Sequence, residues 1–232
     1  MEITSSIWNQ MPLFGCLASW IILALSTRIK TERKDVSETH YQFPLHAFMI
    51  VGLLSGALIY GLTLYLTGIP LLYFSSILII MLVQATIDFF YKEIALEWIA
   101  LSLVIHMAYI HYEGSYSHHM LGFMFMIFVL MLLCSIFAGL GVGDTLLLTA
   151  NSILFYPGTY QRIVFTYLIG LRWFFLVFAI PQMFVWLYFS YKKRKGTLPS
   201  KDDPSGKPIT LPFIPFYTVS FVTWLFGMII RR

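Results

Sequence analysis

The chain consists of long apolar runs separated by short polar or charged segments. About 20 mostly apolar residues are enough to cross the hydrocarbon core of a bilayer as a helix. The runs are continuously apolar and longer than the roughly 10-residue alternating segments of a membrane β-barrel, so we expect helices. The sequence therefore predicts an all-α, polytopic membrane helical bundle of about eight transmembrane spans. These spans are expected near residues 12–28, 43–66, 69–90, 94–111, 119–138, 145–157, 163–190 and 211–230.

Composition excludes a soluble globular domain. Of the 232 residues, 59% are hydrophobic and only 11% are charged, whereas soluble domains carry about 25% charged residues. We expect a single integral membrane domain over residues 1–232, with a mobile cytoplasmic loop at about 192–211 that is rich in Lys, Pro, Ser, Asp and Gly. The first apolar run is expected to be a retained span, because no Lys or Arg precedes it as in a cleavable signal.

Basic residues predict the orientation in the membrane. Loops on the cytoplasmic side carry an excess of Lys and Arg. Eleven of the fifteen basic residues fall in loops on one face of the predicted bundle. Eight spans would then leave both termini outside, although Arg231 and Arg232 argue against that side for the C-terminus. The net charge of +4 says little about partners, because Lys and Arg in a membrane protein mainly report topology. We expect the lipid bilayer as a partner and no direct binding of nucleic acid. The eleven are Arg28, Lys30, Arg33, Lys34, Lys92, Lys192, Lys193, Arg194, Lys195, Lys201 and Lys207.

Two acidic residues lie against apolar runs. Asp88 ends the third run and Asp144 precedes the sixth. An ionised carboxylate within the bilayer costs about 2.5–3.5 kcal/mol on insertion scales, so such residues are functional candidates. Both are expected at similar depth on the cytoplasmic side, where a close pair would share one proton and hold a water for hydrolysis. The alternative is structural, because an Asp at the start of a span is a common helix cap.

Glycines alternate ahead of the second aspartate, at Gly139, Gly141 and Gly143. Glycine is a poor helix former and leaves the backbone uncovered. We expect this segment to run extended and Gly141 and Gly143 to bring backbone groups close to a substrate strand.

Other polar side chains suggest weaker hypotheses. Glu93 and Glu97 could attract a basic peptide to Asp88, or could face water or pair with Lys92. The two cysteines stand alone in apolar runs, so neither a disulfide framework nor a zinc site is expected. Four histidines cluster around one outer loop, but we interpret them as incidental and expect no metal. They are His106, His111, His118 and His119.

Three segments resemble a known family in the same order along the chain. Gly141-Val142-Gly143-Asp144 is a GxGD motif, and Ile87-Asp88 followed by Lys92-Glu93-Ile94 resembles the first aspartate region of bacterial type IV prepilin peptidases. Leu211-Pro212-Phe213-Ile214-Pro215-Phe216 resembles that family's late Pro-Phe signature. With a weaker similarity at Gly15-Cys16-Leu17, the resemblance extends from about residue 13 to 226.

The resemblance implies an aspartic-type endopeptidase of the cell membrane, with Asp88 and Asp144 as catalytic residues and no cofactor. Its implied partners are type IV pilin-like precursors, as in pilus or competence systems, whose basic leader is removed at the cytoplasmic face. Members that also methylate the new N-terminus commonly carry two cysteine pairs in the first cytoplasmic loop. Loop 29–42 has no cysteine, so only the peptidase activity is expected.

Three alternatives remain open. Signal-peptide-peptidase-like proteases share GxGD, but their first aspartate follows a Tyr, whereas Ile87 precedes Asp88 here. A membrane carrier could use two intramembrane acids to bind a cation. An assembly scaffold without catalysis is the third.

Overall fold

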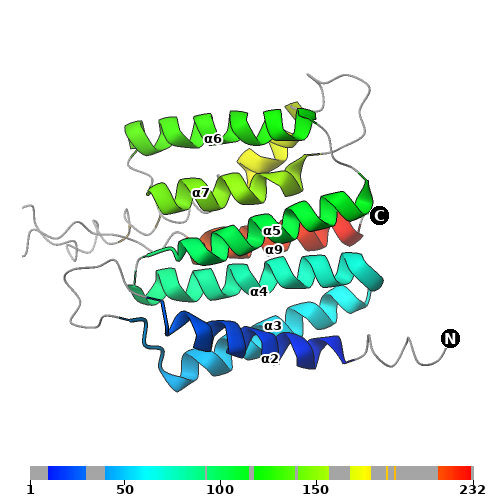
Figure 1. Cartoon of the computed structure of the whole chain (residues 1–232), viewed down its shortest axis with the longest axis vertical. Coiled ribbons are helices and arrows are strands. Elements are labelled where there is room, and N and C mark those ends of the chain that lie inside the picture. The colour runs from blue at the N-terminus through cyan, green and yellow to red at the C-terminus, as the bar shows by residue number, and fades with distance from the viewer. Residues whose placement is uncertain are drawn as a thin grey trace, which may run out of the picture.

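The computed structural model describes residues 10–29, 40–91, 93–114, 118–138, 141–156, 168–178 and 214–230, together with Leu187 and Tyr191. These residues form a bundle of helices without a β-strand (Figure 1), which confirms the all-α prediction for this part of the chain. Residues 192–211, where a loop was predicted, lie outside the described residues. The elements are α2 (Met11–Ser26), α3 (Leu45–Thr63), α4 (Gly68–Tyr91), α5 (Leu96–Glu113), α6 (His118–Ala138), α7 (Val142–Asn151), the 3-10 helix η1 (Ser152–Phe155) and α9 (Ile214–Ile230), with a further helical stretch at Leu168–Phe178.

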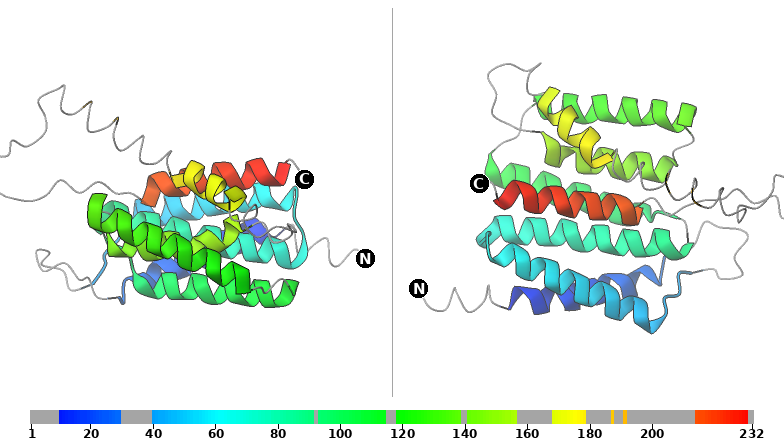
Figure 2. Two further views of the ribbon diagram at one scale, coloured as in Figure 1. Left: turned by 90° about the horizontal axis from the view of Figure 1, so that it is seen from above. Right: turned by 180° about the vertical axis from the view of Figure 1, so that it is seen from behind.

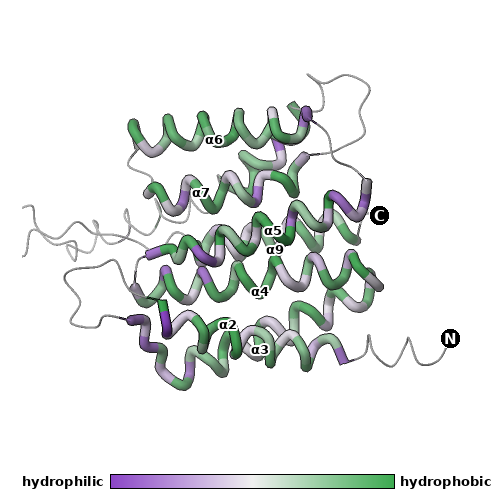
Figure 3. The backbone as a smooth tube through the Cα atoms, viewed as in Figure 1, coloured by the Kyte–Doolittle hydropathy of each residue, from purple (hydrophilic) through white to green (hydrophobic). Residues whose placement is uncertain are grey.

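The helices occupy the positions of the apolar runs. Three of them are long and apolar enough to cross a membrane: α3, α4 and the part of α6 from His118 to Ile136. Four shorter apolar helices are Met11–Ser26, Val142–Phe155, Leu168–Phe178 and Ile214–Ile229. Hydrophobic residues dominate along the helices and hydrophilic ones gather mainly toward their ends (Figure 3). These lengths and compositions indicate a membrane protein.

The helix directions bring several helix ends to one side of the bundle. In Figure 1, α4 ends at the left, where α5, α7 and α9 begin. At the opposite side, α2 begins and α9 ends. There the chain turns from α5 toward α6 at Gly114, whose φ of +63° is a left-handed conformation that glycine adopts without strain. The two aspartates both belong to helix ends on the first side.

Helix α4 is the centre of the bundle. It packs against α2, α3, α5 and α9, and α9 runs alongside it on the far side of the view in Figure 1 (Figure 2). Every residue from Ile77 to Ala85 is buried, so the helix is covered on all of its faces. A helix that is apolar all round belongs in the core. By contrast, outer helices expose large apolar side chains, for example Leu45 and Phe125, as expected for contact with lipid.

Candidate functional site

Asp88 lies in the last turn of α4, in the core of the bundle. Its side chain is only 6% exposed. Oδ2 of Asp88 accepts a hydrogen bond of 2.8 Å from the backbone N–H of Ile214, the first residue of α9. The first N–H groups of a helix have no acceptor within the helix. The carboxylate of Asp88 therefore joins the end of α4 to the start of α9.

Asp144 lies in the first turn of α7. Gly141 is the N-cap of this helix, with an extended backbone at φ −62° and ψ 148°. The carboxyl group of Asp144 accepts a backbone hydrogen bond from Gly141, and an acidic side chain in the first turn is stabilised by the helix dipole. The main-chain N–H and side-chain hydroxyl of Thr145 both donate to the Gly141 carbonyl, at 3.0 and 3.1 Å. Asp144 thus projects from a well-defined helix start.

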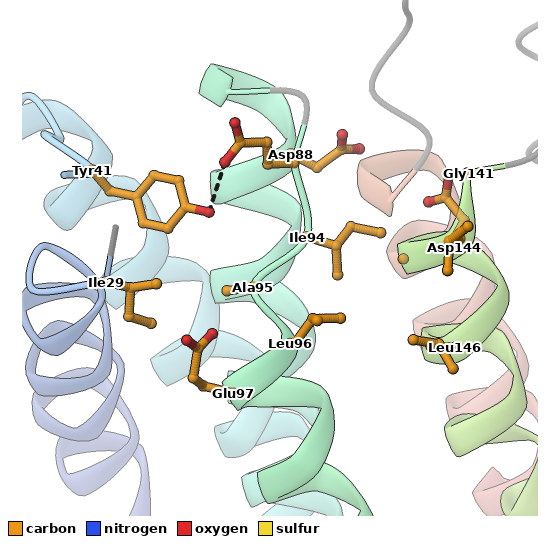
Figure 4. A pocket seen from close by; sticks show the side chains of 13 residues that line it. Ile29, Tyr41, Asp88, Ile94, Ala95, Leu96, Glu97, Gly141, Asp144 and Leu146 are labelled. Carbon is orange, nitrogen blue, oxygen red and sulfur yellow. Dashed lines mark hydrogen bonds between the residues drawn. The ribbon is translucent and has the colours of Figure 1, made fainter. Parts of the chain in front are cut away.

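The two aspartates line one cavity of about 420 Å³ at this end of the bundle. Figure 4 shows Asp88 coming from α4 and Asp144 from α7, with their carboxyl groups on facing sides of the space. The two groups interact electrostatically. Positions 88 and 144 are far apart in the sequence, so packing of α4, α5 and α7 brings them together. The structure also places Gly141 and Gly143 in the lining of this cavity.

The cavity is acidic. Besides the aspartates, Glu93 and Glu97 line it, and no Lys or Arg is among its described lining residues. Tyr41, which is 2% exposed, donates a hydrogen bond of 3.0 Å from its hydroxyl to Oε2 of Glu93 (Figure 4). Four carboxyl groups around one space favour the approach of a positively charged ligand. The remaining lining residues are Ile29, Ile94, Ala95, Leu96, Val142 and Leu146.

A buried glutamine holds the turn that forms one wall of the cavity. Gln84 is fully buried in α4. Its Nε2 donates to the carbonyl of Ala95 at 2.7 Å, and its Oε1 accepts from the N–H of Ala95 at 3.2 Å. The connection between α4 and α5 is therefore fixed against α4 at a residue that lines the cavity.

A second clamp holds the segment ahead of α3. The hydroxyl of Tyr91 hydrogen bonds both the backbone N–H and the backbone carbonyl of Gln42. The ring of Tyr91 packs edge-to-face on that of Tyr41, with centroids 4.8 Å apart. These contacts place the Tyr41 hydroxyl beside Glu93.

The glycines differ from the extended arrangement predicted for them. Gly141 is extended, but Gly143 already belongs to the first turn of α7; Gly139 lies outside the described residues. A Cβ at Gly143 would lie 3.0 Å from Cβ of Ile94, closer than ordinary contact between carbon atoms. The physical reason for glycine at 143 is thus the close approach of α7 to the connection between α4 and α5. The expectation of an extended strip is wrong at this residue.

The histidines are distributed differently from a metal cluster. His106 is fully buried, with Nδ1 2.7 Å from the Tyr73 hydroxyl and Nε2 3.3 Å from Oδ1 of Asn151. This network joins α4, α5 and α7 away from the cavity. Across the described residues, no group of three or more His, Cys, Asp or Glu side chains is arranged to hold a metal ion.

Sequence reasoning missed three contributors to the site. Gln84 lies four positions before Asp88, and residues four apart share a helix face, so an amide within the apolar run 69–90 was a usable signal. Tyr41 and Ile214 gave no such signal, because their contacts with Glu93 and Asp88 span 52 and 126 positions. Of the two prolines in the late Pro-Phe segment, Pro215 is the second residue of α9, and Pro212 lies outside the described residues.

This arrangement is suited to acid–base chemistry on a water molecule. Two facing carboxyl groups that interact electrostatically share a proton more readily than they both ionise. One member can then accept a proton while the other donates one.

No protein-family model, curated protein or solved structure matches the chain.

Proposed function

We propose that the chain is a membrane-embedded aspartyl endopeptidase that removes the basic leader peptide from type IV prepilin-like precursors. The observation that carries this proposal is the pair Asp88 and Asp144 on facing sides of one acidic cavity. The resemblance of the GxGD segment and the late Pro-Phe segment to prepilin peptidases supplies the substrate class. Cleavage would use no metal and no cofactor.

In the proposed reaction, a water molecule lies between the two carboxyl groups. The ionised aspartate accepts a proton from the water, whose oxygen attacks the carbonyl carbon of the scissile peptide bond. The protonated aspartate donates its proton to the carbonyl oxygen, giving a tetrahedral intermediate. As the C–N bond breaks, the aspartate that accepted the water proton donates it to the nitrogen. The other aspartate takes back a proton from a hydroxyl of the intermediate, and the new carboxyl and amino ends leave.

The acidic cavity suits the proposed substrate. A leader rich in Lys and Arg would be attracted to Glu93 and Glu97, while the apolar helix that follows it stays in the lipid. We place the cavity at the cytoplasmic face of the cell membrane, because the sequence predicts the basic loops on the side where the third apolar run ends at Asp88 and the sixth follows Asp144. The protein would be multi-pass in this membrane.

The test is cleavage of a pilin-like precursor, with a basic leader that ends in glycine, by the purified protein in lipid. We expect a single cut after the glycine, read from the product masses, and loss of cleavage in Asp88→Asn and Asp144→Asn. Glu113→Gln is the matched control, because Glu113 is an exposed acid at the opposite end of α5 and outside the cavity. All four proteins are compared by their unfolding transitions in detergent.

Two results would overturn the proposal. One is that the wild type leaves a panel of such precursors intact. The other is that Asp88→Asn or Asp144→Asn cleaves as fast as Glu113→Gln. With S-adenosylmethionine added as a methyl donor, an additional methyl group on the product would show that the protein also methylates, contrary to our expectation from loop 29–42.

A further inference from the structure

The hydrogen bond between α4 and α9 links the late Pro-Phe segment to the aspartate pair. Both atoms are enclosed, since Ile214 is fully buried and Asp88 is 6% exposed. The 2.8 Å separation between Ile214 N and Asp88 Oδ2 is short for an N–H donor, as expected for a charge-assisted bond. In addition, Ile214 begins a helix of 17 residues, so its N–H belongs to the positive end of a helix dipole.

Each aspartate receives a hydrogen bond from a backbone N–H. Asp144 receives its hydrogen bond from Gly141, at the start of its own helix. Asp88 receives its bond from Ile214, which lies 126 positions away. In Asp88, this bond fixes the plane of a carboxyl group that lines the cavity. A reacting group must be held within a fraction of an ångström to act efficiently.

We infer that the backbone N–H of Ile214 is a positioning group for the reaction, which orients the Asp88 carboxyl toward Asp144. This inference rests on the proposed function for its catalytic part. The first residue of α9 would then act on the reaction through Asp88. If it were only the start of a helix, packing of α9 against α4 would be its whole role. Pro215 supports the same role, because a proline in the first turn has a backbone already suited to a helix start.

The substitution Ile214→Pro tests the inference, because it removes this N–H at a helix position that tolerates proline. We expect kcat to fall at least tenfold, about 1.4 kcal/mol in the barrier, while KM changes less than about twofold. The conservative Ile214→Val, which keeps the N–H, is expected to recover kcat. A role in packing alone would instead lower the amount of folded protein without separating kcat from KM.

Leu45→Pro is the matched control. Leu45 is the first residue of α3, its side chain is 78% exposed, and it lies outside the cavity lining. The preceding Pro44 has φ −67° and ψ 153°, a conformation that a following proline permits. This variant introduces the same residue at the same helix position, so its kcat should stay at the wild-type value. Equal losses of kcat in Leu45→Pro and Ile214→Pro, or no loss in Ile214→Pro, would overturn the inference.

A second measurement is independent of cleavage. In detergent, the unfolding free energies of Ile214→Pro, Asp88→Ala and the double variant form a double-mutant cycle. We expect Ile214→Pro to be less destabilising when Asp88 is already alanine, because the acceptor is then absent. If the wild type cleaves no precursor, the proposed function fails, and this cycle still decides whether the N–H of Ile214 holds Asp88. Additive effects would overturn the inference.

Discussion

The substitution Gly143→Ala tests whether the close approach of α7 to the connection between α4 and α5 is needed to bring the aspartates together. The added Cβ would lie 3.0 Å from Cβ and 3.3 Å from Cδ1 of Ile94. Carbon atoms prefer roughly 3.5–4.0 Å, so one side must move by a few tenths of an ångström. The neighbouring Ala95 is pinned by Gln84 through two hydrogen bonds. We therefore expect α7 to move, and Asp144 with it.

Two opposing effects set the change in stability. Overpacking a tight contact costs about 1–3 kcal/mol in a core, and Gly143 and Ile94 are both half-buried. Replacing glycine by alanine within a helix gains about 0.5–1 kcal/mol. The net expectation is a loss of about 0–2.5 kcal/mol in the unfolding free energy. The effect on cleavage should be larger, because reacting groups must be held within about 0.5 Å of their productive geometry.

The assay compares Gly143→Ala with Gly227→Ala for unfolding in detergent and for precursor cleavage. Gly227 lies in α9, where an added Cβ would meet no atom within 4 Å. It should gain about 0.5–1 kcal/mol of stability and cleave at the wild-type rate. The reasoning is refuted if Gly143→Ala unfolds and cleaves like the wild type, because the approach of α7 to Ile94 would then have no consequence.

Three further predictions concern the surroundings of the cavity and the pair itself. Gln84→Leu should destabilise the fold by about 1–3 kcal/mol for each of the two Ala95 backbone groups that lose their hydrogen-bond partner. Unfolding in detergent measures this loss. An unchanged unfolding transition would contradict the role of Gln84 in holding Ala95. His106→Phe should also destabilise the fold, because the Tyr73 hydroxyl and the Asn151 side-chain oxygen lose their shared partner. The folded fraction should keep its cleavage rate, because these residues lie outside the cavity lining. A lower kcat in fully folded protein would contradict this prediction. Cleavage should depend on pH with a maximum, since one aspartate must be ionised and the other protonated, and a rate that only rises or only falls across the pH range would argue against a shared proton.

Much of the fold was predictable because it depends on local pattern. The apolar runs gave the helices, and the energetic cost of a membrane carboxylate singled out Asp88 and Asp144. The structure places both at helix ends on the same side of the bundle, as expected from the alternation of spans. Among the described residues, the helices long and apolar enough to cross a membrane are α3, α4 and the part of α6 from His118 to Ile136.

The supporting contacts were not predictable, and the reason is physical. The bond from Ile214 to Asp88 and the bond from Tyr41 to Glu93 depend on which helices pack side by side, and no local periodicity encodes that choice. Gly143 was interpreted as an open backbone for substrate. Its role in packing depends on the position of Ile94, which belongs to a different segment.

The bond between α9 and α4 also imposes an order on biosynthesis. The ribosome makes Asp88 126 residues before Ile214, so α4 reaches the membrane while its carboxyl still lacks this donor. A carboxylate near hydrocarbon raises the cost of inserting α4 by roughly 2.5–3.5 kcal/mol, and the arrival of α9 offsets part of that cost. Ile214 belongs to the last helix that the structure describes. A growing chain therefore contains both aspartates before it contains the N–H group that holds Asp88. On the proposed function, we expect newly made protein to cleave substrate only after α9 has joined the bundle.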